Sequence, residues 1–443
     1  MYFICIVCLQ NIFCVYLLYS IIMLQYIRLK LANSHIIFVC WSILAAFGAY
    51  FCMYAFRKPF NNGIYEGLSL WGLHYKSVLI IAQVLGYMMS KFIGIKVISE
   101  LKPQHRKWLI VSLIAIGQIG LILLGLIPYP YNFVCLFING LPLGMVWGVI
   151  FSYLEGRRFT ELIAMGLTMS QIIASGSLKT IYFMVKNYWP GVDQFWLPAL
   201  IGFIFFPLFL FFTWMLSMIP PPSGEDIALR RERLPMTLKE KKEVWKMYAV
   251  PLVLIIIVYC FVSTLRDFRD SFSVEIWGEI SPNFDKIVFI QTETISAIIL
   301  FIIIGLYSFV KGNRLGFQLV SVMIFLSILI SGGSSIMYHF GRISPFVWMQ
   351  LVGLGLFMGY MPLQIVFFDR FIALFNVKSN AGFFVYTCDS IGYLGSVILL
   401  FIKDILNADL ASSKMLIHST IVHLVVSDVY KRQRLYQQVV CNR

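Results

Sequence analysis

Apolar runs of about 20 residues, separated by short polar segments, recur along almost the whole chain. Each run is long enough to cross the hydrocarbon core of a bilayer as a single helix. The pattern therefore predicts an all-α polytopic membrane protein with twelve spans, at about 36–58, 78–98, 108–127, 132–154, 162–185, 195–219, 249–268, 286–309, 316–337, 345–368, 379–402 and 411–427.

The hydrophilic stretch 220–248 interrupts this pattern. It carries seven basic and five acidic residues, and six predicted spans lie on each side of it. A charged segment of this kind is typical of a solvated connector. The sequence therefore predicts an N-terminal six-helix bundle at 35–219, a cytoplasmic connector at 220–248 and a C-terminal six-helix bundle at 249–427.

The two ends of the chain depart from the pattern. Residues 1–34 begin with an apolar run that lacks the basic start of a signal peptide. We expect this run to be either an extra helix or upstream DNA read in frame, with Met23 as the start. Residues 428–433 read DVYKRQ, which resembles a translated sequencing adapter. We therefore expect 428–443 to be an artefact and the last span to be cut short.

Composition excludes a soluble protein, because 60% of the 443 residues are hydrophobic and only 13% are charged. The net charge of +14 belongs mostly to loops, so it does not indicate nucleic-acid binding. The predicted inner loops hold 16 Lys and Arg, and the outer segments hold 6. Because cytoplasmic loops are enriched in basic residues, we expect the core termini in the cytoplasm and the protein in a bacterial inner membrane.

An internal repeat places an arginine at the same position in both halves. Tyr50 and Arg57 lie seven residues apart at the end of an apolar run, and Tyr259 and Arg266 repeat this arrangement 209 residues further along. A duplicated transporter brings equivalent side chains of its two halves to one site. The repeat therefore predicts that Arg57 and Arg266 share a site between the bundles.

The fourth and tenth predicted spans repeat a second motif. The sequence GLPLGMVWG begins at Gly140, and GLGLFMGYM begins at Gly353, so that Trp147 corresponds to Tyr360. Small residues in such spans let helices pack closely. No strand precedes these glycines, so they do not indicate a phosphate-binding loop.

Ionisable residues inside the spans are unevenly distributed. The third, sixth and ninth spans have none in their interiors. A charge at the bilayer centre costs roughly 2.5–3.5 kcal/mol, so the charged positions should face water or one another. In a two-bundle transporter the first, second, fourth and fifth helices of each half line the cavity. The charges that fit this division are Arg57, Lys58, Lys91, Lys179, Arg266, Arg269, Glu293 and Asp389.

Cations at a common depth suit an anionic solute. Arg57 lies 17 residues after Cys40, Lys179 17 after Leu162 and Arg266 17 after Ala249, and all three spans run outward. The planar guanidinium of arginine holds two oxygens of a carboxylate or phosphate. We therefore expect substrate binding by Arg57, Lys58, Lys91, Lys179, Arg266 and Arg269.

Two alternatives remain open for these cations. Arg57 and Lys58 lie near the outer end of their span, where long basic side chains can reach the headgroups. Arg266 and Asp270 are four residues apart and could pair on one helical face, which would neutralise the second half of the site.

Glu293 and Asp389 are the expected proton-coupling carboxylates, because a buried carboxylate can take up a proton as the site alternates. A permanent salt bridge from Asp389 to Lys179 or to an arginine is the alternative. Neutral hydrogen-bonding groups would come from Gln83, Tyr87, Gln171, Gln291, Tyr360, Gln364 and Tyr386.

An enzyme is not expected, because no nucleophile–base arrangement, metal cluster or phosphate loop stands out in the sequence. We expect no cofactor and no metal. The expected partners are a small-molecule solute and the lipid bilayer, with protons or phosphate as counter-substrate.

Three motifs in the first half carry a family resemblance: YAFRKPF at 54–60, SKFIG at 90–94 and GLPLGMVWG at 140–148. They resemble the major facilitator superfamily and, locally, its organophosphate:phosphate antiporters. The resemblance implies that Arg57 and Arg266 hold phosphate and that Lys91 matches that family's second-helix lysine. The sequence RDFRD at 266–270 departs from the antiporter pattern.

The core at 36–427 also resembles an uncharacterised family of bacterial membrane proteins related to this superfamily, through NGLPLGMVWG, LEGRR and RDFRD. We therefore expect a secondary transporter of a small organic anion, phosphorylated anions included, that works by alternating access. The alternative is a transporter-like receptor that senses a solute without moving it. A lipid-handling or structural protein is a third reading, and it predicts no saturable solute binding.

Overall fold

The computed structural model describes residues 23–99, 101–154, 160–221, 238–307, 309–310, 312–375, 381–406 and 412–424. The N-terminal half consists of six long helices that follow the predicted spans closely. They are α2 (His35–Arg57), α3 (Tyr75–Ser99), α4 (Arg106–Leu126), α5 (Phe133–Leu154), α6 (Thr160–Tyr188) and α7 (Leu197–Ser217).

The C-terminal half repeats this arrangement with α9 (Leu238–Ser271), α11 (Val288–Tyr307), α12 (Asn313–His339), α13 (Pro345–Pro362), α15 (Ala381–Leu406) and a helical segment at 412–424. A π-helical turn, η3 (Leu363–Phe367), continues α13 into α14 (Phe368–Phe375). The short helix α10 (Ser273–Ile280) follows α9. The predicted fold of two six-helix bundles is confirmed.

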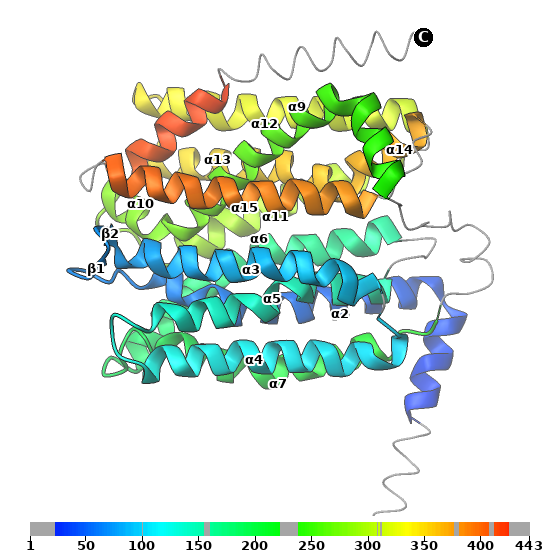
Figure 1. Ribbon diagram of the computed structural model, residues 1–443, viewed down its shortest axis with the longest axis horizontal. Helices are drawn as coiled ribbons and strands as arrows, with labels where there is room; N and C mark the ends of the chain where they lie inside the picture. Colours follow the sequence, from blue (N-terminus) through cyan, green and yellow to red (C-terminus); the bar gives the residue numbers. More distant parts are fainter. Residues whose placement is uncertain are drawn as a thin grey trace, which may run out of the picture.

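The remaining described elements are short and lie between helices. The 3-10 turn η1 (Pro59–Asn62) continues from α2, and an antiparallel hairpin pairs β1 (Ser69–Leu70) with β2 (Leu73–His74) before α3. A further 3-10 turn, η2 (Pro103–His105), leads into α4. The hairpin and α10 lie at the same end of the molecule (Figure 1).

The two halves form two layers of roughly parallel helices (Figure 1). Between the layers α6 packs against α11, and α3 packs against α15. In the N-terminal half α3 is the second helix and α6 the fifth, and in the C-terminal half α11 is the second and α15 the fifth. Each of these two contacts therefore joins the second helix of one half to the fifth helix of the other. The interface is therefore pseudo-symmetric, as expected for two bundles that enclose a central site.

Nine helical segments in the described part of the chain are long and apolar enough to cross a membrane. Large apolar side chains are exposed along α7 and α11, among them Phe203, Phe211, Ile298 and Phe301. An apolar exposed surface of this kind requires a lipid environment. The chain is therefore a multi-pass membrane protein. Neither α6 nor α15 is among the nine, and both helices lie at the interface between the halves.

The described part of α9 begins at Leu238, inside the stretch that was predicted to be connector. The helix bends at Tyr248, whose backbone angles are φ −119° and ψ 23°. Pro251 lies one turn further on, and its ring interferes with the preceding turn of a helix. Part of the predicted connector, at 222–237, lies outside the described residues, as do the first 22 residues and the tail at 428–443.

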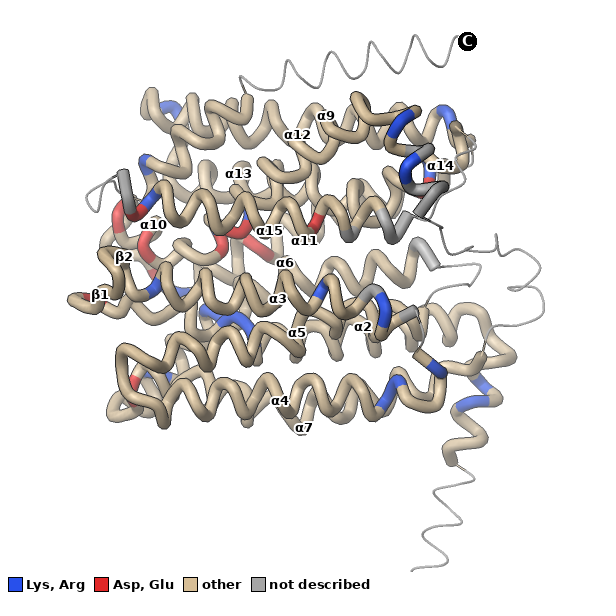
Figure 2. Tube along the Cα trace, viewed as in Figure 1, with Lys and Arg blue, Asp and Glu red and all other residues tan. Residues whose placement is uncertain are grey.

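Charged residues divide along the long axis of the helices. Lys and Arg gather at the end where α14 and the starts of α4 and α9 lie, and Asp and Glu concentrate toward the end with α10 (Figure 2). This is the distribution that the loop composition predicted.

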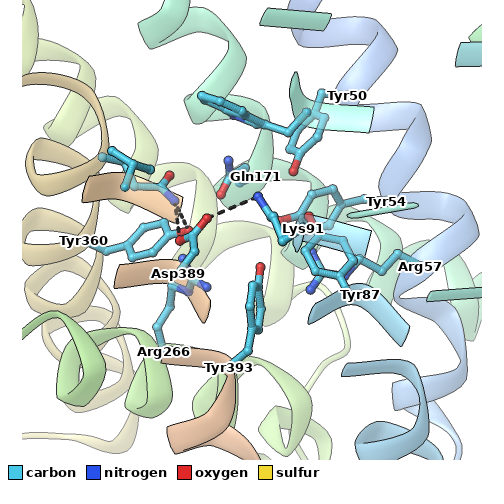
Figure 3. Close-up of a pocket in the computed structure, with 13 residues that line it drawn as sticks. Tyr50, Tyr54, Arg57, Tyr87, Lys91, Gln171, Arg266, Tyr360, Asp389 and Tyr393 are labelled. Carbon is cyan, nitrogen blue, oxygen red and sulfur yellow. Dashed lines mark hydrogen bonds and ion pairs between the residues drawn. The ribbon is translucent and has the colours of Figure 1, made fainter. Parts of the chain in front are cut away.

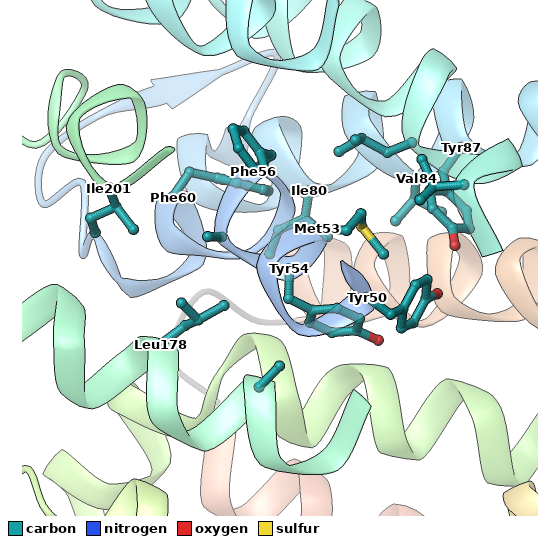
Figure 4. Packing of buried hydrophobic residues seen from close by; sticks show 14 of the residues in the cluster. Tyr50, Met53, Tyr54, Phe56, Phe60, Ile80, Val84, Tyr87, Leu178 and Ile201 are labelled. Carbon is teal, nitrogen blue, oxygen red and sulfur yellow. The ribbon is translucent and has the colours of Figure 1, made fainter. Parts of the chain in front are cut away.

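The C-terminal part of α2 and the turn η1 after it are enclosed by the other helices of their own half. Met53, Phe56 and Phe60 pack with Ile80 of α3 and Ile201 of α7 (Figure 4). These contacts fix the rotation of α2 about its axis. As a result Tyr50, Tyr54 and Arg57, which are spaced at one helical face, point toward the other half.

Close helix approach explains two of the repeated glycines. A Cβ on Gly140 of α5 would collide with the carbonyl oxygen of Gln83 on α3, and a Cβ on Gly353 of α13 would collide with the guanidinium of Arg269. The prediction that these glycines serve packing is confirmed.

Candidate functional site

A small cavity lies between the two halves, near the middle of the helices. Its volume is about 20 Å³, which is room for one or two water molecules. Its lining comes from α2, α3, α5, α6, α9, α13, η3 and α15. Of the eight helices that the charges predicted to line it, α11 contributes no lining residue. The lining residues are Tyr50, Tyr54, Arg57, Tyr87, Lys91, Trp147, Gln171, Arg266, Tyr360, Gln364, Val385, Asp389 and Tyr393.

Arg57 supplies a buried positive charge from the N-terminal half. Its guanidinium carbon lies 3.9 Å from the ring centre of Tyr87 and 5.9 Å from that of Tyr54, so two aromatic faces hold it. The residue is 7% exposed, and no carboxylate pairs with it among the described residues. Its Nε atom likewise has no hydrogen-bond partner there. Arg57 is therefore a desolvated cation that has no counter-ion in the part of the chain that the structure describes.

Arg266 reaches the same cavity from the C-terminal half, as the repeat predicted. It donates hydrogen bonds of 2.7 and 3.2 Å to Asp267 Oδ1, and its guanidinium carbon lies 3.5 Å from the ring centre of Tyr360. The expected pairing of Arg266 with Asp270 is wrong, because Asp270 binds lysines of the other half. The neutralising partner of Arg266 is Asp267.

Lys91 and Asp389 form an ion pair across the cavity. Lys91 Nζ lies 3.2 Å from Asp389 Oδ2, and Figure 3 shows Lys91 reaching from the N-terminal half toward the carboxylate. Asp389 Oδ1 also accepts hydrogen bonds from the hydroxyl of Tyr259 and from Gln364 Nε2, the latter at 3.0 Å. The partner of Asp389 is therefore Lys91, and the expected bridge to Lys179 or to an arginine is wrong.

Lys58 and Lys179 lie outside the cavity lining. Both bind Asp270 at the end of α9, and the Lys179 Nζ to Asp270 Oδ1 distance is 2.6 Å. Because Lys58 and Lys179 belong to the N-terminal half and Asp270 to the C-terminal half, this cluster joins the halves. Headgroup contact by Lys58 is not observed, since its side chain is only 12% exposed and is paired.

A second bridge joins the halves at the same end. Lys76 of α3 pairs with Glu275 of α10, and Asn61 Nδ2 donates a 3.3 Å hydrogen bond to Ser271 Oγ. Together with the Asp270 cluster, these contacts close the end of the molecule that carries α10. We call this set of inter-half contacts the α10-side closure.

Arg269 and Glu293 form a pair within the C-terminal half. Arg269 Nη1 lies 2.7 Å from Glu293 Oε1, and Arg269 Nη2 donates a 3.0 Å hydrogen bond to the carbonyl oxygen of Met349. Both side chains are buried, and neither lines the cavity. This pair holds α9, α11 and α13 together.

The structure thus brings four of the predicted site residues together: Arg57, Lys91, Arg266 and Asp389. Among the predicted neutral groups, Tyr87, Gln171, Tyr360 and Gln364 line the cavity. Gln83 instead donates hydrogen bonds to the carbonyl oxygen of Arg57 and to Asn139.

Sequence reasoning missed five lining residues: Tyr50, Tyr54, Trp147, Val385 and Tyr393. The spacing held a signal for three of them: Tyr50 and Tyr54 share a helical face with Arg57, and Tyr393 follows Asp389 by four residues. No group of three or more His, Cys, Asp or Glu residues within the described ranges could hold a metal ion.

Comparison with solved structures identifies the fold. The chain superposes on a mutant of the nucleoside transporter NupG with a TM-score of 0.60 at 14% identity, covering 89% of this chain and 99% of that one. For a D-xylose–proton symporter the TM-score is 0.60 at 12% identity, with 89% and 97% covered. Identities this low establish the major-facilitator fold alone.

Sequence comparison identifies the family. No curated protein matches the chain. The model of the family of unknown function DUF5690 matches residues 59–436, which is most of the chain. The protein therefore belongs to DUF5690, a family of unknown function.

Proposed function

We propose that the protein is a secondary active transporter of a small organic anion and works by alternating access. The observation that carries this proposal is Arg57, a buried cation in a cavity between the halves with no carboxylate partner among the described residues. Leaving a charge desolvated and unpaired is costly, so such a group persists where a ligand supplies the opposite charge.

The charges around the cavity favour a monoanion. Arg57, Lys91 and Arg266 contribute three positive charges, and Asp267 and Asp389 contribute two negative ones. One positive charge remains for the solute. Phosphorylated dianions would leave the site with a net negative charge, so the local likeness to organophosphate antiporters carries less weight than the structure of the site.

Substrate contact would then centre on Arg57, with Lys91 and Arg266 beside it. Lys58, Lys179 and Arg269 already hold carboxylates outside the cavity lining. For these three residues we propose a structural role in place of substrate binding.

Asp389 is the proposed proton-coupling residue. It is the one carboxylate among the residues that line the cavity, and its ion pair with Lys91 joins the halves. Protonation of Asp389 would break that ion pair and permit the two halves to move relative to each other. Glu293 is held by Arg269 away from the cavity, which favours Asp389 over Glu293 for this role.

The charge asymmetry supports an orientation. The basic end with α14 would face the cytoplasm of a bacterial cell, and the end with α10 would face outward. The α10-side closure then blocks the outer entrance in this conformation. The core termini would lie in the cytoplasm.

The names of the structural relatives support transport over sensing. One is a nucleoside transporter and the other a D-xylose–proton symporter. A solute receptor remains the second candidate, because it would need the same buried cation. Uptake measurements separate the two functions.

The test is counterflow in proteoliposomes that contain the full chain. Labelled glycerate, gluconate, propionate, hexanoate and glycerol 3-phosphate would be offered to the parent protein and to Arg57→Gln. We expect saturable uptake of at least one anion and a loss of roughly 10- to 100-fold in Arg57→Gln, because a hydrogen-bonded charge contributes about 1.5–3 kcal/mol. Equal uptake by both forms would contradict the proposal, and binding without uptake would favour the receptor.

A further inference from the structure

Three buried polar atoms that line the cavity lack any hydrogen-bond partner among the described residues. They are Arg57 Nε, Trp147 Nε1 and Gln364 Oε1. Buried polar atoms in folded proteins are almost always paired, and each unpaired atom costs about 1–3 kcal/mol. Unpaired buried atoms also occur elsewhere among the described residues, but these three belong to the lining of one small cavity, where a ligand can supply the missing partners.

The chemistry of these atoms is mixed. Arg57 Nε and Trp147 Nε1 can only donate a hydrogen bond, and Gln364 Oε1 can only accept one. A complementary ligand must therefore carry both acceptor oxygens and a hydrogen-bond donor. A simple aliphatic carboxylate supplies acceptors but no donor, and a neutral polyol supplies no charge for Arg57.

The direction of the Gln364 amide is fixed by its neighbour. Gln364 Nε2 lies 3.0 Å from Asp389 Oδ1 and also contacts the hydroxyls of Tyr259 and Tyr360. The ionised carboxylate that pairs with Lys91 can only accept, so it requires the NH₂ group of Gln364 on its side. The amide oxygen is then the atom that has no hydrogen-bond partner among the described residues, so it is available as an acceptor for the solute.

The backbone supports the same assignment. Gln364 lies in the π-helical turn η3, directly after Pro362. Proline has no backbone N–H, and widened turns of this kind occur frequently at functional sites. The local widening interrupts the continuous helix at the position of the unpaired amide.

The rest of the lining suits hydroxyl groups. Five phenol groups surround the cavity, and each can both donate and accept a hydrogen bond. They belong to Tyr50, Tyr54, Tyr87, Tyr360 and Tyr393. Figure 3 shows the hydroxyls of Tyr50 and Tyr393 directed toward the space around Lys91.

We propose that the solute is a small hydroxylated monocarboxylate, such as a hydroxy acid or a sugar acid. This inference rests on the proposed function and names the substrate class of the same site. The carboxylate binds Arg57, a further oxygen accepts from Trp147, and a hydroxyl donates to Gln364.

Binding to the purified full-length protein tests this class independently of transport. Two series would be titrated by calorimetry, each with a hydroxy acid, its matched aliphatic acid and its matched polyol. The first series is glycerate, propionate and glycerol, and the second is gluconate, hexanoate and glucitol. Glycerol 3-phosphate would be titrated beside them. We expect at least one hydroxy acid to bind more than about tenfold tighter than its matched acid and its matched polyol.

The variant Gln364→Leu should weaken binding of the hydroxy acid by about tenfold more than it weakens binding of the matched aliphatic acid. Gln350→Leu is the control. Gln350 is also buried and also has an unpaired Oε1, but it donates to Ser296 and does not line the cavity. We expect no change in binding from that substitution.

Three results would overturn the inference. In the first, an aliphatic acid or glycerol 3-phosphate binds more tightly than both hydroxy acids and depends on Arg57; the class is then wrong and anion binding stands. In the second, a polyol binds as tightly as its hydroxy acid and Arg57→Gln has no effect; the anion function then falls as well. In the third, neither hydroxy acid binds in an Arg57-dependent way.

Discussion

Lys91 and Asp389 lie 3.2 Å apart, although they belong to opposite halves of the chain. Both side chains are almost fully buried, at 6% and 5% exposure. An ion pair buried this deeply is stabilising only while both partners are charged and in contact. Loss of either charge would therefore break a contact between the halves, and that contact lies in the lining of the central cavity.

Substitution of Asp389 by Asn should uncouple transport from the proton gradient. Asn cannot take up a proton, so the uptake that a pH gradient drives should fall to the level seen in counterflow. Counterflow itself should continue. Paired measurements in the same proteoliposomes check this. Gradient-driven accumulation that survives in Asp389→Asn would contradict the coupling role. Glu66→Gln, at an exposed acid outside the cavity, is the control.

Substitution of Glu293 by Gln should affect stability and leave coupling intact. The change leaves Arg269 buried without its counter-ion, which costs about 3–5 kcal/mol. A fall in the thermal unfolding temperature of the purified protein would show this. The double variant Arg269→Met/Glu293→Leu should recover much of the loss, because it buries no charge. A Glu293→Gln protein of parental stability would refute the structural role.

Substitution of Asp270 by Asn should open the α10-side closure. The change removes the shared partner of Lys58 and Lys179 and so weakens the contact between the halves. Val385→Cys, in a cysteine-free background, places a thiol in the cavity lining. An impermeant thiol reagent added from outside should label it about tenfold faster in Asp270→Asn, for a shift of about 1.4 kcal/mol.

Two comparisons make that experiment specific. Glu66→Gln removes an exposed acid from the segment between α2 and α3 and should not change the labelling rate. Reagent added from the cytoplasmic side should label the Asp270→Asn protein more slowly, because the outward-open state would gain population at the expense of the other. Unchanged labelling from both sides would show that Asp270 does not hold the entrance shut.

Addition of a methyl group at Gly140 should destabilise the N-terminal half. A Cβ there meets the carbonyl oxygen of Gln83, which belongs to backbone and cannot move aside cheaply. Overpacking of this kind costs about 1–3 kcal/mol. Gly333→Ala in α12 is the matched control, since nothing lies within reach of its Cβ. It should be neutral or stabilising by about 0.5–1 kcal/mol. Thermal unfolding of both variants distinguishes the two cases.

The spacing of single residues carried the predictions that the structure confirmed. The repeat of Arg57 at Arg266 predicts that both arginines share a site, and both line one cavity. The motif that carries Trp147 and Tyr360 predicts helix packing alone, yet both aromatic rings also line that cavity. Equivalent positions in two similar bundles meet at the axis that relates them, so the repeat encodes a three-dimensional relation. Helix periodicity likewise places Tyr50 and Tyr54 on the same helical face as Arg57.

Ion-pair partners could not be predicted in the same way. Local spacing favoured Arg266 with Asp270, yet Arg266 binds Asp267 and Asp270 binds Lys58 and Lys179. Opposite charges four residues apart can pair on the surface of any exposed helix. A buried charge instead pairs with the group that tertiary packing places next to it. For Asp270 those partners come from the other half of the chain.

The sequence by itself determined the number of helices, their division into two bundles and the helices that enclose the site. These follow from apolar run length, from the cost of charge in lipid and from the repeat, all of which are properties of the chain read in order. The tertiary structure decided which cation remains unpaired. Arg57 differs from Lys58, Lys179 and Arg269 only in what faces it in the folded protein, and that is set by the rotation and register of helices that lie far apart in the sequence.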